Sequence, residues 1–146
     1  MASNKTALKA AKSALDAGKY DEAITQAQII LASDSQNYFA KLFLGRASEK
    51  QEKVDDAAKA YESAAKIKPD DSQAWLGLCS LYEHQGSRKV DEYRLAAVRL
   101  AEIYAEADDL HRCQSTVDKL VAFVKQYGSQ DQYKRALEVL LPTSSV

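Results

Sequence analysis

The chain has 146 residues, of which 46% are hydrophobic and 28% charged, a balance typical of a folded protein rather than of a disordered segment. Its 20 basic and 21 acidic side chains leave a net charge near −1, which disfavours electrostatic binding to nucleic acid or to anionic lipid. No apolar run approaches the roughly 20 residues that a membrane span needs, and residues 1–12 lack the apolar core of a signal peptide. Only two prolines and five glycines suggest long regular elements with few turns. We therefore expect a soluble, intracellular and mostly helical protein.

Turn and capping residues set the expected helix limits. We expect Gly18, Gly86 and Gly128 to end helices in the left-handed conformation. The polar runs 33–35 and 69–72 have the composition of turns and helix N-caps. The predicted helices, in chain order, are residues 4–17, 20–33, 37–51, 54–67, 72–85, 89–106, 108–127 and 130–141.

An internal period of 34 residues runs through the first part of the chain. It superposes residues 18–23 on residues 52–57 and carries Leu8 to Leu42 and then to Leu76. Such a period, with small and large residues alternating at the helix crossings, is typical of the tetratricopeptide repeat (TPR), a helix–turn–helix unit. We therefore predict an all-α, TPR-like right-handed superhelix of about four antiparallel hairpins. The residues assigned to packing positions are Ala23, Leu44, Gly45, Ala57, Tyr61, Ala64, Pro69, Trp75, Leu78 and Tyr82, with the three aromatic side chains largely buried.

The repeat register fails beyond Gly86. A shift of 34 residues from Ala57 lands on Asp91, which cannot serve as a small packing residue. An insertion of about five residues would restore the pattern at Ala96 and Leu100, so we expect the third hairpin to be irregular. Because no low-complexity linker divides the chain, residues 1–146 are predicted to form one domain.

The sequence contains no catalytic motif that we can identify. A glycine-rich phosphate loop, HExxH, GxSxG and paired-cysteine motifs are absent. Cys79 and Cys113 are interpreted as buried thiols, with a metal or thiol site as the less favoured alternative. Adjacent aspartates near helix starts are interpreted as favourable to the helix dipole rather than as a cation site. We expect no enzyme activity, no metal and no cofactor.

The first helix of each hairpin is expected to line a concave face. There the sequence places lysines beside aromatic side chains, which suits a partner segment with acidic residues next to an apolar anchor. The alternative is a solvated lysine face whose aromatic side chains are covered by a neighbouring helix. The candidate partner-binding residues are Lys9, Lys12, Phe39, Leu42, Phe43, Arg46 and Lys50.

One TPR class is disfavoured by the residues at its binding positions. Co-chaperones of this repeat hold a peptide carboxylate with a clamp of Lys, Asn, Asn, Lys and Arg. The equivalent positions here are Leu8, Lys12, Phe43, Gln73 and Gly77, and none keeps its clamp residue. A carboxylate would meet Leu8 and Phe43 rather than hydrogen-bond donors.

The order of the repeat residues matches a second TPR class more closely than it matches the co-chaperones. Residues 5–23, 57–69 and 74–83, with the irregular third hairpin at a comparable place, resemble the extreme N-terminus of the TPR scaffold subunits of superkiller (Ski) complexes. The resemblance covers roughly residues 5–140 and implies an N-terminal fragment of a longer scaffold. It also implies a cytoplasmic, non-catalytic arm of a helicase complex that feeds mRNA to the exosome for 3′–5′ decay.

The resemblance implies protein partners and no residue-level site. In that family the scaffold carries helicase and WD-repeat subunits, and its N-terminal arm is implied in contacts with the factor that bridges to the exosome. Direct nucleic-acid binding and membrane binding are not expected. The alternative function is a free-standing TPR adaptor that binds a peptide segment of a partner; RNA binding by the arm itself is the third hypothesis.

Overall fold

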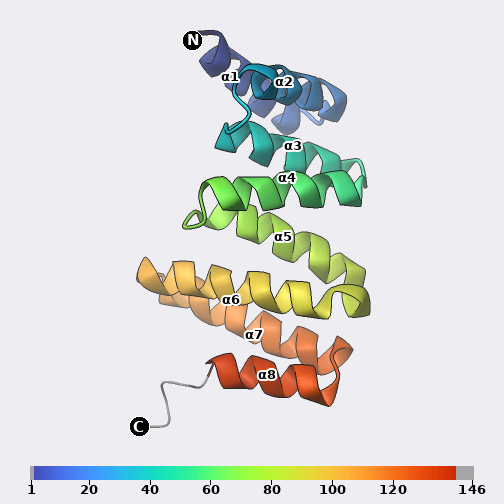
Figure 1. Cartoon of the computed structure of the whole chain (residues 1–146), viewed down its shortest axis with the longest axis vertical. Coiled ribbons are helices and arrows are strands. Elements are labelled where there is room, and N and C mark those ends of the chain that lie inside the picture. The colour runs from blue at the N-terminus through green and yellow to red at the C-terminus, as the bar shows by residue number, and fades with distance from the viewer. Residues whose placement is uncertain (1, 141–146) are drawn as a thin grey trace. The chain divides into compact units, whose positions relative to one another are not determined.

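The computed structural model describes residues 2–140, and the side-chain environments of residues 4–138. This part of the chain forms eight α-helices and one 3-10 helix, without a strand (Figure 1). The all-helical prediction is confirmed, and the helix ends within the described residues agree with the predicted ones to within two residues. Residue 141, in the last predicted helix, lies outside them. The elements are α1 (Ala2–Asp16), α2 (Tyr20–Ser33), α3 (Tyr38–Lys50), α4 (Val54–Ile67), α5 (Ser72–Gln85), η1 (Gly86–Lys89), α6 (Val90–Glu106), α7 (Leu110–Tyr127) and α8 (Gln130–Leu140).

The chain folds into two compact units, Met1–Gly77 and Leu78–Val146. The boundary lies inside α5, whose residues 72–77 belong to the first unit and 78–85 to the second. Each unit is described by itself below.

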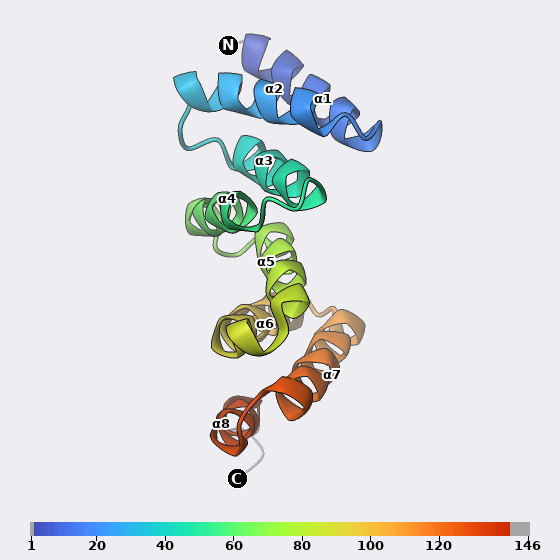
Figure 2. The ribbon, with the colours of Figure 1, turned by 90° about the vertical axis from the view of Figure 1, so that its right-hand side faces the viewer.

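The first unit contains two antiparallel hairpins, α1 with α2 and α3 with α4 (Figure 2). Helix α2 also packs on α3, so helices from the two hairpins share one core. Ala14 of α1, Ala23 of α2 and Ala47 of α3 meet in a buried cluster. Methyl side chains let the three helix backbones approach closely.

A single tyrosine fills the space beside α3 and α5 in the same unit. Tyr61 of α4 is 1% exposed. A Cβ atom at Gly45 would lie 2.7 Å from its ring carbons, and one at Gly77 would lie 2.6 Å from them. The Tyr61 hydroxyl donates a hydrogen bond to Oε1 of Glu49 at 2.8 Å. The ring therefore requires glycine on both neighbouring helices.

The second unit is built on α6 and α7, with α8 packed against both. Ring centroids of Tyr93 and Phe123 lie 4.2 Å apart, and those of Phe123 and Tyr127 lie 4.9 Å apart. The 3-10 helix η1 separates α5 from α6 and accounts for the break in the 34-residue period. The residues predicted to resume the pattern, Ala96, Leu100 and Ile103, are buried, and Asp91 is exposed.

Two of the three glycines have the predicted conformation. Gly18 (φ +76°) and Gly86 (φ +58°) are left-handed. The prediction for Gly128 is wrong, because its φ of −86° and ψ of 161° are extended. Glycine is favoured at position 128 for another reason, because a Cβ atom there would lie 2.7 Å from the carbonyl oxygen of Val124. Glu52 and Asp108 take left-handed positions that the sequence did not indicate.

The predicted packing residues differ in burial. Trp75 is partly buried, less so than Tyr61 and Tyr82, and its Nε1–H donates to the carbonyl oxygen of Pro69 at 2.9 Å. Pro69 itself is exposed, and Leu44 is half-buried. The buried members of the set are Ala23, Gly45, Ala57, Tyr61, Ala64, Leu78 and Tyr82.

Candidate partner-binding surfaces

The predicted first-helix surface keeps its lysines in solvent. Lys9 and Lys12 are exposed on α1, and Lys50 is exposed at the end of α3. The Lys12 ammonium lies 3.3 Å from Oδ2 of Asp16, one helical turn away. Exposed pairs of this kind contribute little to stability, so Lys12 remains accessible to a partner.

The apolar members of that surface are in the core instead. Leu42 is fully buried and Phe43 is 6% exposed, so neither can serve as an anchor for a partner in this conformation. Arg46 is half-buried and donates from Nη2 to Oε1 of Gln73 at 3.0 Å. The sequence interpretation assigned these three residues to contacts with a partner, but the structure uses them for contacts within the chain.

Phe39 is the exposed aromatic residue of the set. Its ring is 39% exposed and lies 6.2 Å from the Phe43 ring, centroid to centroid. The Lys68 ammonium lies 5.1 Å from its centroid and 5.0 Å from that of Tyr38. The Lys68 cation lies within cation–π range of both rings, yet Phe39 stays 39% exposed, so no neighbouring helix covers this end of α3 completely.

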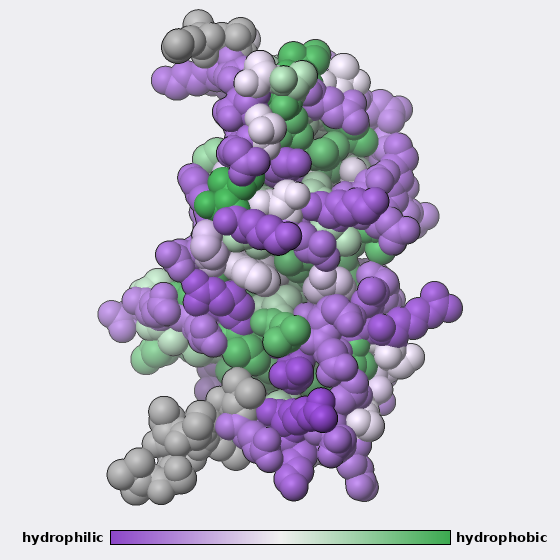
Figure 3. Space-filling model, viewed as in Figure 1, coloured by the Kyte–Doolittle hydropathy of each residue, from purple (hydrophilic) through white to green (hydrophobic). Residues whose placement is uncertain are grey.

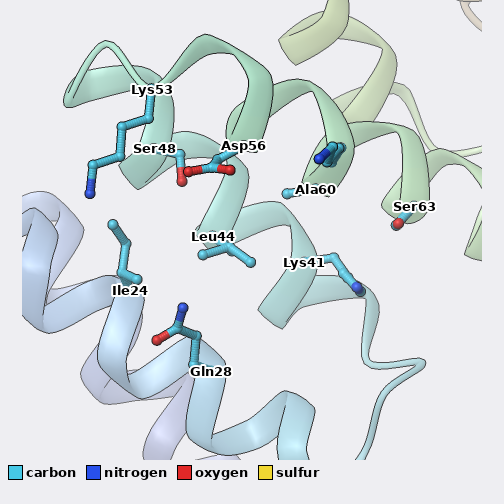
Figure 4. Close-up of a pocket in the computed structure, with 10 residues that line it drawn as sticks. Ile24, Gln28, Lys41, Leu44, Ser48, Lys53, Asp56, Ala60 and Ser63 are labelled. Atoms are coloured by element: carbon cyan, nitrogen blue, oxygen red, sulfur yellow. The ribbon is translucent and has the colours of Figure 1, made fainter.

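A different surface is hollowed between the second helices of the two hairpins and α3. A groove of about 320 Å³ runs between α2, α3 and α4, all within the first unit (Figure 4). We call it the lysine groove. It is lined by Ile24 and Gln28 of α2, Lys41, Leu44 and Ser48 of α3, and Lys53, Asp56, Lys59, Ala60 and Ser63 from the start and body of α4.

The lysine groove has an apolar floor and a positively charged rim. Figure 4 shows Leu44 between Lys53 at one end and Lys41 at the other, with Ile24 reaching in from α2. Three lysines face one carboxylate, Asp56, which lies beside Ser48. Asp56 stands in the first turn of α4, where the helix dipole favours a negative charge. The groove therefore carries an excess of positive charge.

Sequence reasoning missed the lysine groove for a physical reason. It assigned binding to the first helix of each hairpin, whereas five of the ten lining residues belong to α4 or to the residue that precedes it, and two to α2. The sequence could have indicated this groove through Lys53, just before α4, and Lys59 and Ser63, which lie near one face of α4. Two other hollows are each lined by five consecutive residues at a turn, 52–56 and 67–71, and bring together no distant side chains.

The cysteines lie in different environments. Cys79 is 8% exposed, and burial together with the Glu83 carboxylate raises the pKa of its thiol to about 12. Cys113 is only partly buried, which departs from the prediction of two buried thiols. Among residues 2–140, no three His, Cys, Asp or Glu side chains are grouped closely enough to hold a metal ion.

The exposed apolar side chains come from several helices. The large apolar side chains that are exposed in the described chain include Ile29, Leu76, Leu95 and Leu110. In the view of Figure 3, hydrophobic residues form separate areas between hydrophilic ones. No helix within the described residues combines the length and the apolar character needed to cross a bilayer.

The sequence model of the tetratricopeptide repeat matches residues 8–72 and 49–89, which together make up more than half of the chain. The chain belongs to the tetratricopeptide repeat family. A crystal structure of a thermophilic TPR protein of Thermus thermophilus is similar at a TM-score of 0.50 and 14% identity, covering 94% of this chain and 81% of that one. That likeness concerns the fold alone.

Three curated TPR relatives share much more sequence. Superkiller protein 3 of Schizosaccharomyces pombe is 36% identical over 138 residues, 94% of this chain and 10% of that protein. Superkiller complex protein 3 of Mus musculus is 35% identical over 141 residues, and that of Homo sapiens 32% over 140; each alignment covers 95% of this chain and 9% of the relative. The predicted resemblance is thus confirmed, and this TPR chain spans about a tenth of the length of these relatives. A role as a protein-interaction scaffold follows from the family.

Proposed function

We propose that the chain is the N-terminal arm of the TPR scaffold in a superkiller complex, a cytoplasmic helicase assembly that feeds mRNA to the exosome for 3′–5′ decay. One observation supports this most: identity of 32–36% extends over 94–95% of the chain. The thermophilic TPR protein covers as much of the chain at only 14% identity. The packing of TPR helices by itself therefore does not require a sequence identity as high as 32–36%.

The proposed role is mechanical rather than catalytic. Stacked helical hairpins present extended surfaces, and each surface can hold a segment of another protein. We propose that this arm contacts the factor that bridges to the exosome, while the helicase and WD-repeat subunits bind the parent scaffold elsewhere.

The free-standing adaptor remains a second candidate, because the lysine groove offers a place for a peptide without any larger assembly. The length of the natural open reading frame distinguishes the scaffold from the adaptor. Continuation into further repeats supports the scaffold, and a stop after Val146 supports the adaptor.

Co-purification tests the scaffold proposal. The tagged chain is mixed in turn with the purified helicase subunit, the WD-repeat subunit and the exosome-bridging factor. We expect the bridging factor to be retained in near-equal amount. The thermophilic TPR protein, which shares the fold, is the matched control and should retain none. Retention of no subunit by this chain would refute the proposed arm.

A further inference from the structure

We propose that the lysine groove binds an acidic segment of a partner protein, with one apolar side chain of that segment on the groove floor and its carboxylates on the lysines. The identity of the partner rests on the proposed function. The chemistry of the bound segment rests on the groove alone.

Charge is the first argument. Lys53 and Lys59 are exposed, Lys41 is half-buried, and within the described residues none of the three forms an ion pair. Other lysines of the described residues, such as Lys9 and Lys50, also form no ion pair, but these three are brought together in one groove. A concave surface strengthens the field of unpaired charges because its walls exclude water. A carboxylate that enters the groove could therefore pair with these lysines without breaking an existing ion pair.

The floor is the second argument. Ile24, Leu44 and Ala60 supply aliphatic surface between the lysines, and Ile24 and Leu44 are half-buried rather than sealed in the core. The volume of about 320 Å³ lies at the small end of ligand pockets, roughly 300–1,000 Å³. A groove of this size suits one branched apolar side chain and its neighbours in a peptide. The partner segment is therefore acidic residues around a Leu or an Ile.

The lining also disfavours nucleic acid. Single-stranded RNA is held without sequence preference by aromatic side chains on which bases stack, together with basic residues along the backbone. The lysine groove has the basic residues, but none of its ten lining residues is aromatic. An acidic peptide uses both the floor and the rim, whereas RNA would use only the rim.

A defined peptide tests the chemistry without knowledge of the natural partner. The probe is the capped pentapeptide Asp-Glu-Leu-Glu-Asp, titrated into the ¹⁵N-labelled 146-residue chain and followed by amide chemical shifts. We expect a Kd of about 1 mM or tighter, with the largest shifts at Ile24, Leu44 and Ala60. The capped control peptide Asn-Gln-Leu-Gln-Asn, which replaces each carboxylate by an amide, should bind at least about tenfold more weakly.

Matched charge reversals locate the site. Lys53→Glu with Lys59→Glu should weaken peptide binding by about tenfold or more, since it places two carboxylates at the rim. Lys125→Glu with Lys134→Glu makes the same change in net charge on exposed positions of α7 and α8, in the second unit, and should change binding by less than about twofold. All four positions are exposed, so both variants should give the helical spectrum of the parent chain.

Four results would overturn the inference: no shifts with the acidic peptide, shifts confined to α1 and the first turn of α3, equal binding of the amide peptide, or equal loss in both variants. Displacement of the acidic peptide by an oligouridylate of similar length would assign the groove to RNA and overturn it as well. The co-purification experiment is independent of these outcomes. If no subunit co-purifies but the acidic peptide binds, the proposed superkiller partner is refuted and the proposed site for an acidic segment stands.

Discussion

Tyr61 stacks its ring against two helix backbones that carry no side chain at the contact. Gly45→Ala would bring a methyl group to 2.7 Å from the buried ring. We expect a loss of about 1–3 kcal/mol in the free energy of unfolding, the range for overpacking in a core. Urea unfolding followed by circular dichroism measures it. Ser13→Ala, at an exposed position of α1, is the control and should stay within about 0.5 kcal/mol of the parent. Equal stability of Gly45→Ala and the parent would show that the ring does not occupy this contact.

The two thiols should react at different rates. Burial raises the pKa of the Cys79 thiol to about 12, so almost no thiolate is present at pH 8, and the side chain is 8% exposed. Cys113 is more accessible. We expect iodoacetamide to label Cys113 in the folded chain and Cys79 only after denaturation, as measured by peptide mass spectrometry. Labelling of Cys79 first would contradict its burial.

The same thiol predicts a pH dependence of stability. The pKa of Cys79 is higher in the folded chain than its ordinary value of 9.0, so the unfolded chain releases this proton first. The stabilisation is complete below pH 9 and is lost as pH rises toward the folded pKa. Between pH 9 and pH 10 this group should lower the free energy of unfolding by about 1 kcal/mol. Cys79→Ala should lack that part of the slope in urea titrations, and Cys113→Ala should keep it. Identical slopes in all three proteins would rule out the assignment.

Periodicity shows at the residue scale which side of a helix is apolar, but not which neighbour covers it. Leu42 and Phe43 were assigned to an open face because the repeat geometry places them on a first helix, and in the structure they are buried. Trp75 is less buried than Tyr61 and Tyr82, and its indole donates a hydrogen bond to the Pro69 carbonyl at the turn before α5. Such outcomes depend on side-chain direction and on the neighbouring helix, which a single sequence does not encode locally.

At the element scale, helix starts were predicted to within two residues, but the caps of α3 and α7 were not identified from the sequence. Asn37 and Asp109 each accept a hydrogen bond from the backbone N–H three residues on, at 3.0 Å from Ala40 and 3.1 Å from Arg112. Glu52 and Asp108 end their helices in the left-handed conformation without glycine. The 3-10 helix η1 was predicted only as an irregularity, because a broken register does not specify what fills the gap.

Loss of the α7 cap should be measurable. Asp109→Ala removes the acceptor for the Arg112 N–H, and we expect a loss of about 0.5–2 kcal/mol, the range for such N-caps. Asp118→Ala, which removes a carboxylate from an exposed interior position of the same helix, is the control and should cost less. Thermal denaturation of the two variants and the parent compares them. A larger loss in Asp118→Ala would mean that the cap does not limit the stability of α7.

The whole molecule has nearly balanced charge, with 20 basic and 21 acidic side chains. Non-specific RNA binding depends on neutralising phosphates with several basic groups. We therefore expect the chain to bind a single-stranded oligouridylate with a Kd weaker than about 10⁻⁴ M at physiological salt, measured by fluorescence anisotropy. Tighter binding with a steep salt dependence would support the third hypothesis, RNA binding by the arm.

The repeat class was predictable at this scale, because the 34-residue period runs through the sequence as far as Gly86. The division at Gly77 was not, since it lies inside one continuous helix whose sequence has no break. One domain over residues 1–146 stays a prediction.

Trp75 offers an optical way to examine that prediction. It is the single tryptophan of the chain, it belongs to the first unit, and its partly buried indole is hydrogen-bonded at the turn before α5. Its emission wavelength therefore reports on the first unit, whereas far-ultraviolet circular dichroism sums over every helix. If the two signals follow one curve on heating, the chain melts as a single cooperative body. If the emission shifts at a different temperature, the two units melt as separate domains, and the native fluorophore has distinguished them without any label.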